Sequence, residues 1–364
     1  MYEHITFDVI LERMMDRIPS DIDKREGSII YDALAPAAVE LAQMYIELDV
    51  ILNETFADTA SREYLIRRAS ERGLTVYPTH HAFLRGVFNI DVDIGTRFSL
   101  EDLNYVVTEK IEGETEYEYM LKCETVGVIG NKYFGRITPI EYVKGLASAE
   151  LTELLIPGEE EEDTEHFRQR YFDSLNAKAY GGNIADYKEK VNAIQGVGGV
   201  KVYPVWNGGG TVKLVIINSD YRIPTSELIN FVQTAVDPIT NSGEGVGVAP
   251  IGHTVTVEAV QEQAINVELI IDYDTGYNFD SLKIAIEEVL ENYLQELRKD
   301  WANKTQTIVR VIQIEARLLD LNGIIDVHDT KLNGGFGNLT LESEVMPILG
   351  VVSENTGEEN ETNS

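Results

Sequence analysis

The sequence predicts a multidomain α+β protein with an N-terminal helical bundle segment, a central β domain and two C-terminal α+β sandwich modules. Its 364 residues exceed what one hydrophobic core usually organises. The apolar residues follow a helical period over the first part of the chain and an alternating, strand-like period after it. An order of helix, glycine, strand, Asn-Gly-Gly turn and strand then occurs twice, which indicates two related modules.

These patterns set the expected boundaries. We expect N-terminal helices over 1–80, a β-rich domain over 81–150, and a hinge with a connecting helix over 151–180. Two α+β modules follow over 181–250 and 251–350, and a disordered acidic tail covers 351–364.

Three helices are predicted in the N-terminal part. The first has Phe7, Ile10 and Leu11 on its apolar face, with Thr6 as N-cap and Pro19 as the stop. Ser28 can cap a second, longer helix, in which Pro36 predicts either a kink or a start close to that residue. A third helix is expected over 60–72 and ends at a glycine.

The second helix carries an unusually long apolar seam. Its members fall seven residues apart in two series, and they are Ile30, Leu34, Ala37, Leu41, Met44, Leu48 and Ile51. One reading is an intrachain helical core. The stripe is longer and wider than the first helix can cover, however, so we favour an interface with helices of other chains.

A hinge is predicted between the two halves of the chain. Alternating strands over 83–140 give way to Pro157 and Gly158, which precede the acidic run 159–163. Such a run is expected to be a solvated linker, and Asp163 or Thr164 then caps a helix that opens the C-terminal half.

The two C-terminal modules are read from their repeated order. The first has a helix capped by Asn183, strands over 200–205 and 212–217, and a helix that begins at Thr225. The second has strands over 255–260 and 265–273, a helix over 280–301 capped by Asp280, and a helix over 311–318. A strand over 324–327 follows, and residues 339–341 are expected to return beside it.

Charge and cysteine content exclude several classes of partner. The 30 basic and 62 acidic residues give a net charge of −32, which repels nucleic acid and anionic membranes. One cysteine, Cys123, cannot form an internal disulfide. No apolar run approaches the roughly 18 residues that span a bilayer, and the first residues lack a secretory pattern, so folding in the cytoplasm is expected.

No catalytic, cofactor or metal site is predicted. The chain lacks a phosphate-binding loop, a His-Glu-x-x-His motif, a Gly-x-Ser-x-Gly motif and paired cysteines. His80 and His81 could bind a metal but are better read as loop residues. Asp272-x-Asp274 resembles the start of a calcium loop, yet Lys283 stands where the glutamate is required, which favours a strand end and a turn.

Several separate stretches, in the right order, resemble the baseplate J-like family from about residue 20 to about residue 350. They are Glu26-Gly27-Ser28-Ile29-Ile30-Tyr31-Asp32-Ala33-Leu34-Ala35-Pro36-Ala37-Ala38, Ala57-Asp58-Thr59-Ala60-Ser61-Arg62-Glu63-Tyr64-Leu65, Leu154-Leu155-Ile156-Pro157-Gly158, Gly181-Gly182-Asn183-Ile184-Ala185-Asp186-Tyr187, Pro204-Val205-Trp206-Asn207-Gly208-Gly209-Gly210 and Ala249-Pro250-Ile251-Gly252-His253. Within that family the chain is most similar to the type found in defective prophages and phage-tail-like bacteriocins.

The resemblance implies a structural wedge subunit in the baseplate of a contractile tail, and no enzyme. Two copies would join one smaller wedge protein through a shared bundle of N-terminal helices, and the module over 251–350 would dimerise to close a ring. The implied neighbours are a sheath-initiator-like protein, the tail hub or spike, and tail-fibre proteins, without nucleic acid or membrane insertion. The particle would assemble in the bacterial host cytoplasm.

Two alternatives stay open at this level. One is a tail-associated cell-wall hydrolase or ligand-binding tail protein. Among 62 carboxylates some pair will lie at a separation suited to glycoside hydrolysis, so the lack of a motif does not exclude this alternative. The other is a free-standing oligomer with no phage context.

Overall fold

The computed structural model describes residues 2–111, 117–176 and 181–354, and these form two compact units. Unit 1 comprises Met1–Tyr77 and Glu162–Asn176, and unit 2 comprises Pro78–Glu161 and Ala177–Ser364. The chain therefore leaves unit 1 after Tyr77, returns after Glu161 and leaves again after Asn176. The mixed α+β class is confirmed.

Unit 1 is helical. Its helices are α1 (Phe7–Met15), α2 (Ile29–Thr55), α3 (Arg62–Ser70) and α4 (Thr164–Asn176). The hydroxyl of Thr6 accepts a hydrogen bond from Val9 N, and that of Ser28 accepts one from Tyr31 N, so both predicted N-caps are confirmed. At the other end of α1, Lys24 Nζ donates to Met15 O at 2.6 Å and to Ile18 O at 2.7 Å. The ammonium group thus satisfies carbonyls that the helix leaves free.

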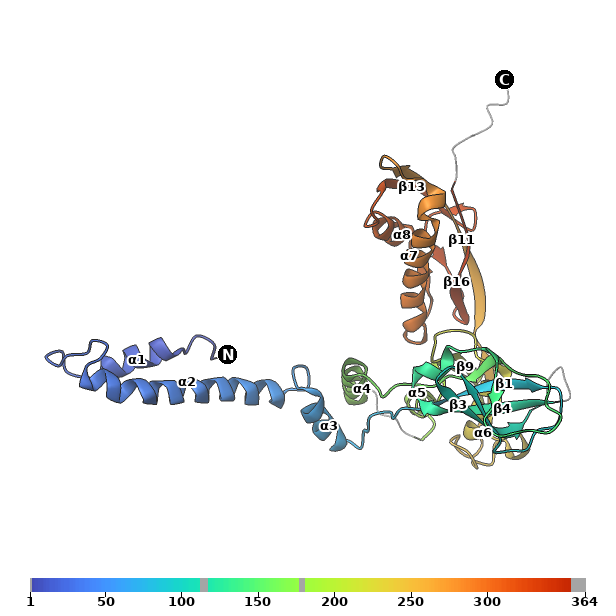
Figure 1. Cartoon of the computed structure of the whole chain (residues 1–364), viewed down its shortest axis with the longest axis horizontal. Coiled ribbons are helices and arrows are strands. Elements are labelled where there is room, and N and C mark those ends of the chain that lie inside the picture. The colour runs from blue at the N-terminus through green and yellow to red at the C-terminus, as the bar shows by residue number, and fades with distance from the viewer. Residues whose placement is uncertain (1, 112–116, 177–180, 355–364) are drawn as a thin grey trace, which may run out of the picture. The chain divides into compact units, whose positions relative to one another are not determined.

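Helix α2 runs without interruption through Pro36. The alternative start close to this proline is wrong, because the Ser28 cap begins the helix well before it. Figure 1 shows α1 lying alongside α2, in agreement with their close contacts. Ile10, Leu11 and Ala38 form the buried centre of this pair.

Helices α3 and α4 share a separate core within unit 1. Phe167 and Tyr171 of α4 pack with residues of and around α3, namely Ala57, Ala60, Leu65, Ala69 and Leu74. Arg168 Nη2 also donates to Ala60 O at 2.9 Å. The prediction that this helix opens the C-terminal half is therefore wrong, because its apolar face is buried in unit 1.

Unit 2 begins with a seven-stranded sheet in the order β5-β7-β1-β4-β3-β2-β6. Its elements are β1 (His81–Phe88), β2 (Arg97–Leu100), β3 (Leu103–Lys110), β4 (Glu118–Val126), the 3-10 helix η1 (Val128–Asn131), β5 (Gly135–Arg136), β6 (Thr138–Pro139) and β7 (Ala149–Ile156). Alternate side chains of β1 and β3 are buried, which matches the alternating pattern of the sequence. The sheet continues past residue 150, because β7 pairs with β1 up to Ile156.

A three-stranded sheet of order β10-β9-β8 follows. Its elements are α5 (Ile184–Asn192), β8 (Val197–Pro204), β9 (Thr211–Asn218), α6 (Ser226–Val236), η2 (Ile239–Asn241) and β10 (Thr254–Ala259). The outer edge of β10 is occupied by side chains of the α6 segment. Gln233 accepts from Val257 N and donates to Val255 O, and buried Asp237 accepts from Val255 N. These bonds satisfy an edge that could otherwise pair with another strand.

The last part contains a four-stranded sheet, in the order β14-β13-β11-β16, and a small β12-β15 pair. Its elements are β11 (Gln261–Tyr273), α7 (Phe279–Lys299), η3 (Trp301–Asn303), β12 (Ile308–Val309), α8 (Val311–Leu318), β13 (Ile324–Leu332), β14 (Gly335–Phe336), β15 (Leu339–Thr340) and β16 (Val345–Glu354). Helix α7 packs its predicted face, including Ile286 and Tyr293, on the sheet.

Three details of this part differ from the sequence prediction. Residues 339–341 do not return beside β13, because Leu339 and Thr340 pair with β12. Asn278, with Ser281 in a capping box, begins α7 in place of Asp280. Residues 351–354 belong to β16, so the predicted disordered tail falls on 355–364, outside the described residues.

Unit 2 is held together across these sheets. Met120, Leu155 and Ile156 of the seven-stranded sheet share a core with residues of the three-stranded sheet and its helices. Arg85 forms ion pairs with Glu118 at 2.7 Å, Glu153 at 3.0 Å and Glu227 at 2.6 Å, and thereby joins β1 to α6. Trp301 and Met346 fill the contact between the three-stranded and four-stranded sheets.

Among the described residues, no helix is both long enough and apolar enough to cross a membrane.

Candidate assembly site

Helix α2 is apolar around most of its circumference, and α1 covers one side of it. The covered side contains Leu34 and Leu41 together with Tyr31, Ala35, Ala38, Ala42 and Tyr45. Tyr2 adds to this side, since its backbone N donates to Asp49 at 3.0 Å and its ring lies 5.5 Å from that of Tyr45. The predicted seam is therefore divided, because Leu34 and Leu41 already have a partner within unit 1.

The other predicted seam residues lie beside the covered side. We call this set the first stripe: Ile30, Ala37, Met44, Leu48 and Ile51. Ala37, Met44, Leu48 and Ile51 are exposed, with Met44 at 56% and Ile51 at 59% of their full accessible area, and Ile30 is partly buried. Solvent contact over so many apolar side chains in a row is typical of a surface that another protein covers.

A second stripe was missed by the sequence analysis. It consists of Val39, Ile46 and Val50, all more than half exposed. Val39 and Ile46 are seven residues apart and Val50 is one turn further, so the same heptad count that found the first stripe could have found this one. The second stripe was overlooked because apolar residues occur on nearly every side of this helix, so no single face stands out in the sequence.

The two exposed stripes face different directions. At about 100° per residue, Met44 and Ile46 lie about 160° apart around the helix axis. A single partner helix cannot cover both stripes, because the contact stripe between two helices is narrower than this separation. Helix α2 therefore leaves two separate apolar surfaces exposed in addition to the side that α1 covers.

Glu162 forms the polar centre of unit 1. Its carboxylate accepts from Arg170 Nη2 at 2.6 Å, from His166 Nδ1 at 2.9 Å and from Tyr77 N at 3.1 Å. Its own backbone N donates to Tyr77 O at 3.0 Å. The Arg170 guanidinium lies over the ring of Tyr77 at 3.9 Å. These contacts hold Tyr77, the residue at which the chain leaves unit 1, against the start of α4.

Electrostatics at this centre favour charged forms. Burial alone would raise the pKa of Glu162, but the hydrogen bonds from His166, Arg170 and Tyr77 N outweigh it and lower that pKa to about 2. The hydrogen bond to Glu162 raises the pKa of His166. The prediction of a solvated acidic run is wrong at this position, because Glu162 is 7% exposed. The spacing of Glu162, His166 and Arg170, four residues each, was the sequence signal.

The predicted hinge residues lie inside unit 2. Pro157 and Gly158 are buried, and the Asn131 side chain accepts from Gly158 N at 2.7 Å and donates to Gly158 O at 3.0 Å. A Cβ atom on Gly158 would lie 2.4 Å from Gly127 O. The boundary between the units comes later, after Glu161.

The candidate metal ligands have structural roles. His80 forms a bridge with Glu159, and His81 Nδ1 lies 2.8 Å from Cys123 O. Asp272 lies in β11 opposite Asp326, while Asp274 O accepts from Tyr277 N in a turn. Within residues 2–111, 117–176 and 181–354, no group of three or more His, Cys, Asp or Glu residues could hold a metal ion.

The chain is similar to known proteins over nearly its full length. A family described as the baseplate J-like central domain matches residues 179–259, and one described as the baseplate J-like protein C-terminal domain matches residues 265–355. Two Bacillus subtilis (strain 168) proteins are each 36% identical over 97% of this chain and 98% of their own length. They are the phage-like element PBSX protein XkdT and the uncharacterized protein YqbT.

A solved structure is similar over most of its length. It is the cryo-microscopy structure of the anti-feeding prophage (AFP) baseplate, 6-fold symmetrised. The match has a TM-score of 0.44 and 8% sequence identity, and it covers 95% of this chain and 90% of that chain.

Proposed function

Because this chain belongs to the baseplate J-like family of phage and phage-like structural proteins, we propose that it is a wedge subunit of a contractile baseplate. The family is structural, which implies a non-catalytic role. In this proposal two copies and one smaller wedge protein share a helical bundle, and copies of the wedge form a ring around the tail hub. The particle is a phage tail or a phage-tail-like bacteriocin.

One observation carries the proposal. Helix α2 exposes two apolar stripes that α1 does not cover, the first centred on Met44 and the second on Ile46. Helices of the second copy and of the smaller wedge protein, short ones such as α1 included, would together bury both stripes when they pack on different sides of α2.

The other partners follow from the place of the subunit in a baseplate. We propose contacts with a sheath-initiator-like protein, with the hub or spike and with tail-fibre proteins. In the described residues, no group of three or more His, Cys, Asp or Glu residues could hold a metal ion, so no such group favours the alternative of a metal-dependent cell-wall hydrolase.

The proposal predicts how the purified chain associates. Without the smaller wedge protein, the chain should form a mixture of oligomers, because that protein supplies part of the helical surface that covers the two exposed stripes. Addition of the smaller wedge protein should convert the mixture to one species with two copies of this chain, as measured by sedimentation and mass photometry. A stable monomer that ignores the smaller protein would contradict the proposal.

We also propose that the chain bends when the sheath contracts. The sequence predicts the hinge at Pro157 and Gly158 and in the acidic run after them, and this remains a prediction. The burial of Pro157 and Gly158 in unit 2 favours the acidic run, with bending after Glu161 at the boundary of the units. Cryo-microscopy of extended and contracted particles distinguishes the two positions. Residues 159–161 should stay with the seven-stranded sheet if the chain bends after Glu161, and should move with α4 if it bends at Pro157 and Gly158. An unchanged angle between the seven-stranded sheet and α4 in the contracted particle would refute both.

A further inference from the structure

Helix α8 has an exposed apolar stripe on the side that faces away from its core. Ile314 and Leu318 are buried beneath the helix, which lies beside α7 (Figure 1). On the outer side, Ile312 is 67% exposed, Leu319 is 44% exposed, and Ala316 between them is also exposed. At about 100° per residue, these three positions lie within about 60° of each other around the helix axis. We call them the α8 stripe.

The α8 stripe differs from the apolar positions on the other helices of unit 2. Within the described residues, α5, α6 and α7 each expose one large apolar side chain, and these are Ile184, Phe231 and Ile284. Helix α8 and its C-cap instead place two large apolar side chains on one face, with a small residue between them. The small residue allows a second helix to approach closely, and the larger residues on either side can then pack against that helix.

The two ends of α8 carry opposite charges. Arg310 is the exposed N-cap residue, and exposed Asp320 directly follows Leu319. Within the part of the chain that the structure describes, neither of these side chains has an ion pair or a hydrogen bond. Each charge also has the same sign as the end of the helix dipole beside it, so α8 itself stabilises neither charge. An antiparallel second α8 would place each charge beside the opposite charge and beside the opposite end of a helix dipole.

We propose that α8 of one copy packs antiparallel on α8 of a second copy, with a two-fold axis close to Ala316. Ile312 of each copy then opposes Leu319 of the other, and Arg310 of each copy comes within reach of Asp320 of the other. Every contact occurs twice, because a two-fold interface is self-complementary. Two helices of this length bury little area, so the inference rests on the proposed function, in which other contacts hold the copies close together.

One engineered cysteine tests the contact directly. The single cysteine of the chain, Cys123, is buried and does not compete. The variant Ala316→Cys places a thiol close to the proposed two-fold axis, where the two Cα atoms come within the roughly 7 Å that a disulfide requires. The full chain is mixed with the smaller wedge protein and mildly oxidised. Because the contact raises the effective concentration of the two thiols, this variant should form a disulfide-linked dimer at least about tenfold faster than control variants.

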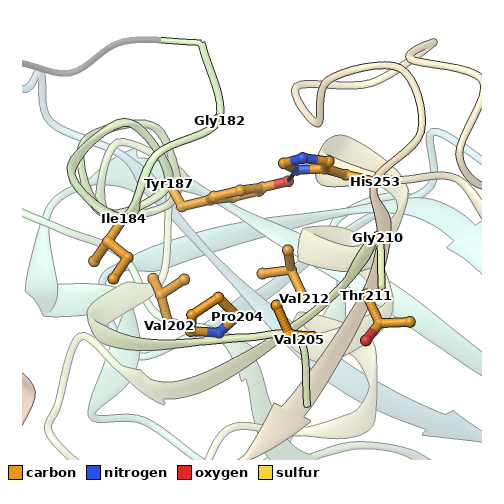
Figure 2. A pocket seen from close by; sticks show the side chains of 10 residues that line it. All are labelled: Gly182, Ile184, Tyr187, Val202, Pro204, Val205, Gly210, Thr211, Val212 and His253. Carbon is orange, nitrogen blue, oxygen red and sulfur yellow. Dashed lines mark hydrogen bonds between the residues drawn. The ribbon is translucent and has the colours of Figure 1, made fainter. Parts of the chain in front are cut away.

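Two exposed apolar residues outside α8 provide the controls. Ile284→Cys lies on α7, and Val205→Cys lies between β8 and β9, where Figure 2 shows Val205 among the residues that line a cavity. Both should link only at the rate of random collision. If wedges form and Ala316→Cys links no faster than the controls, this inference alone is wrong. If the chain forms no wedge, the proposed function is wrong, and the same order of rates is then expected of the chain alone at high concentration.

Charge reversal tests the antiparallel direction. In the Ala316→Cys chain, Arg310→Glu or Asp320→Arg alone should slow the disulfide by about fivefold, because each replaces two attractive charge pairs with repulsive ones. The chain with both reversals restores the attraction and should link at the original rate. Both side chains are exposed, so none of these changes should alter the fold of α8. Slowing by the single reversals without recovery in the double reversal would overturn the antiparallel contact.

Discussion

Replacement of Met44 or Leu48 by aspartate is expected to abolish formation of the wedge while the chain itself stays folded. Both side chains are exposed in the first stripe, so the charge is solvated in the free chain. In the proposed bundle the same charge would be buried without a partner, which costs several kcal/mol. Each substitution should therefore lower the association constant at least about a hundredfold, as measured by sedimentation with the smaller wedge protein.

Matched variants show whether burial of the charge is responsible. Glu47→Lys changes the charge of an exposed residue of α2 that lies outside both stripes, and it should leave association unchanged. Met44→Leu keeps an apolar side chain and should also associate normally. Leu41→Asp is a poorer test, because Leu41 packs against α1 and its loss destabilises unit 1 directly. Normal baseplates with Met44→Asp and Leu48→Asp would show that the first stripe is not an interface.

The second stripe allows a parallel comparison. If α2 contacts two helices, Ile46→Asp should block assembly as strongly as Met44→Asp does. An effect at Met44 without one at Ile46 would indicate a bundle with one contact on each α2. The comparison therefore measures how many helices surround α2.

Local signals predicted the helices and strands well. Thr6 and Ser28 begin their helices because each hydroxyl accepts a backbone N–H, which requires no information from distant residues. The alternating burial of β1 likewise follows from the period of the strand. Heptad spacing placed the first stripe on α2, and the same spacing contained the second.

Contacts between residues that are far apart in the sequence could not be predicted from such local signals. Helix α4 follows the seven-stranded sheet in sequence, but Phe167 finds its partners near α3, about a hundred residues earlier. The sequence shows that α4 has an apolar face and does not show which core receives it. The same difficulty applies to the acidic run, where charge indicates a solvated linker until Arg170 and Tyr77 N are brought to Glu162.

Glu162→Gln is expected to destabilise unit 1 selectively. The carboxylate is buried and its pKa is about 2 in the folded chain against an ordinary value of 4.5. A difference of that size corresponds to about 3 kcal/mol at neutral pH. Unit 1 is helical, whereas Trp206 and Trp301, the two tryptophans, belong to unit 2. Urea unfolding followed by circular dichroism should therefore lose the part of the helical signal that comes from unit 1 at lower urea, while the part from α5 to α8 and the tryptophan fluorescence stay unchanged.

The stability of unit 1 should depend on pH in the directions set by the pKa shifts of Glu162 and His166. Folding lowers the pKa of Glu162, so its contribution is present above about pH 4.5 and is lost as pH falls towards 2. Folding raises the pKa of His166, so its contribution is complete below about pH 6.5 and is lost as pH rises through the higher, folded value. Unit 1 should be most stable between these limits. Glu162→Gln should remove the acidic decline and, because Glu162 raises the pKa of His166, should reduce the alkaline decline as well. His166→Gln should remove the alkaline decline and keep an acidic one, because Arg170 and Tyr77 N still lower the pKa of Glu162. Profiles parallel to wild type in both variants would show that this cluster does not set the stability of unit 1.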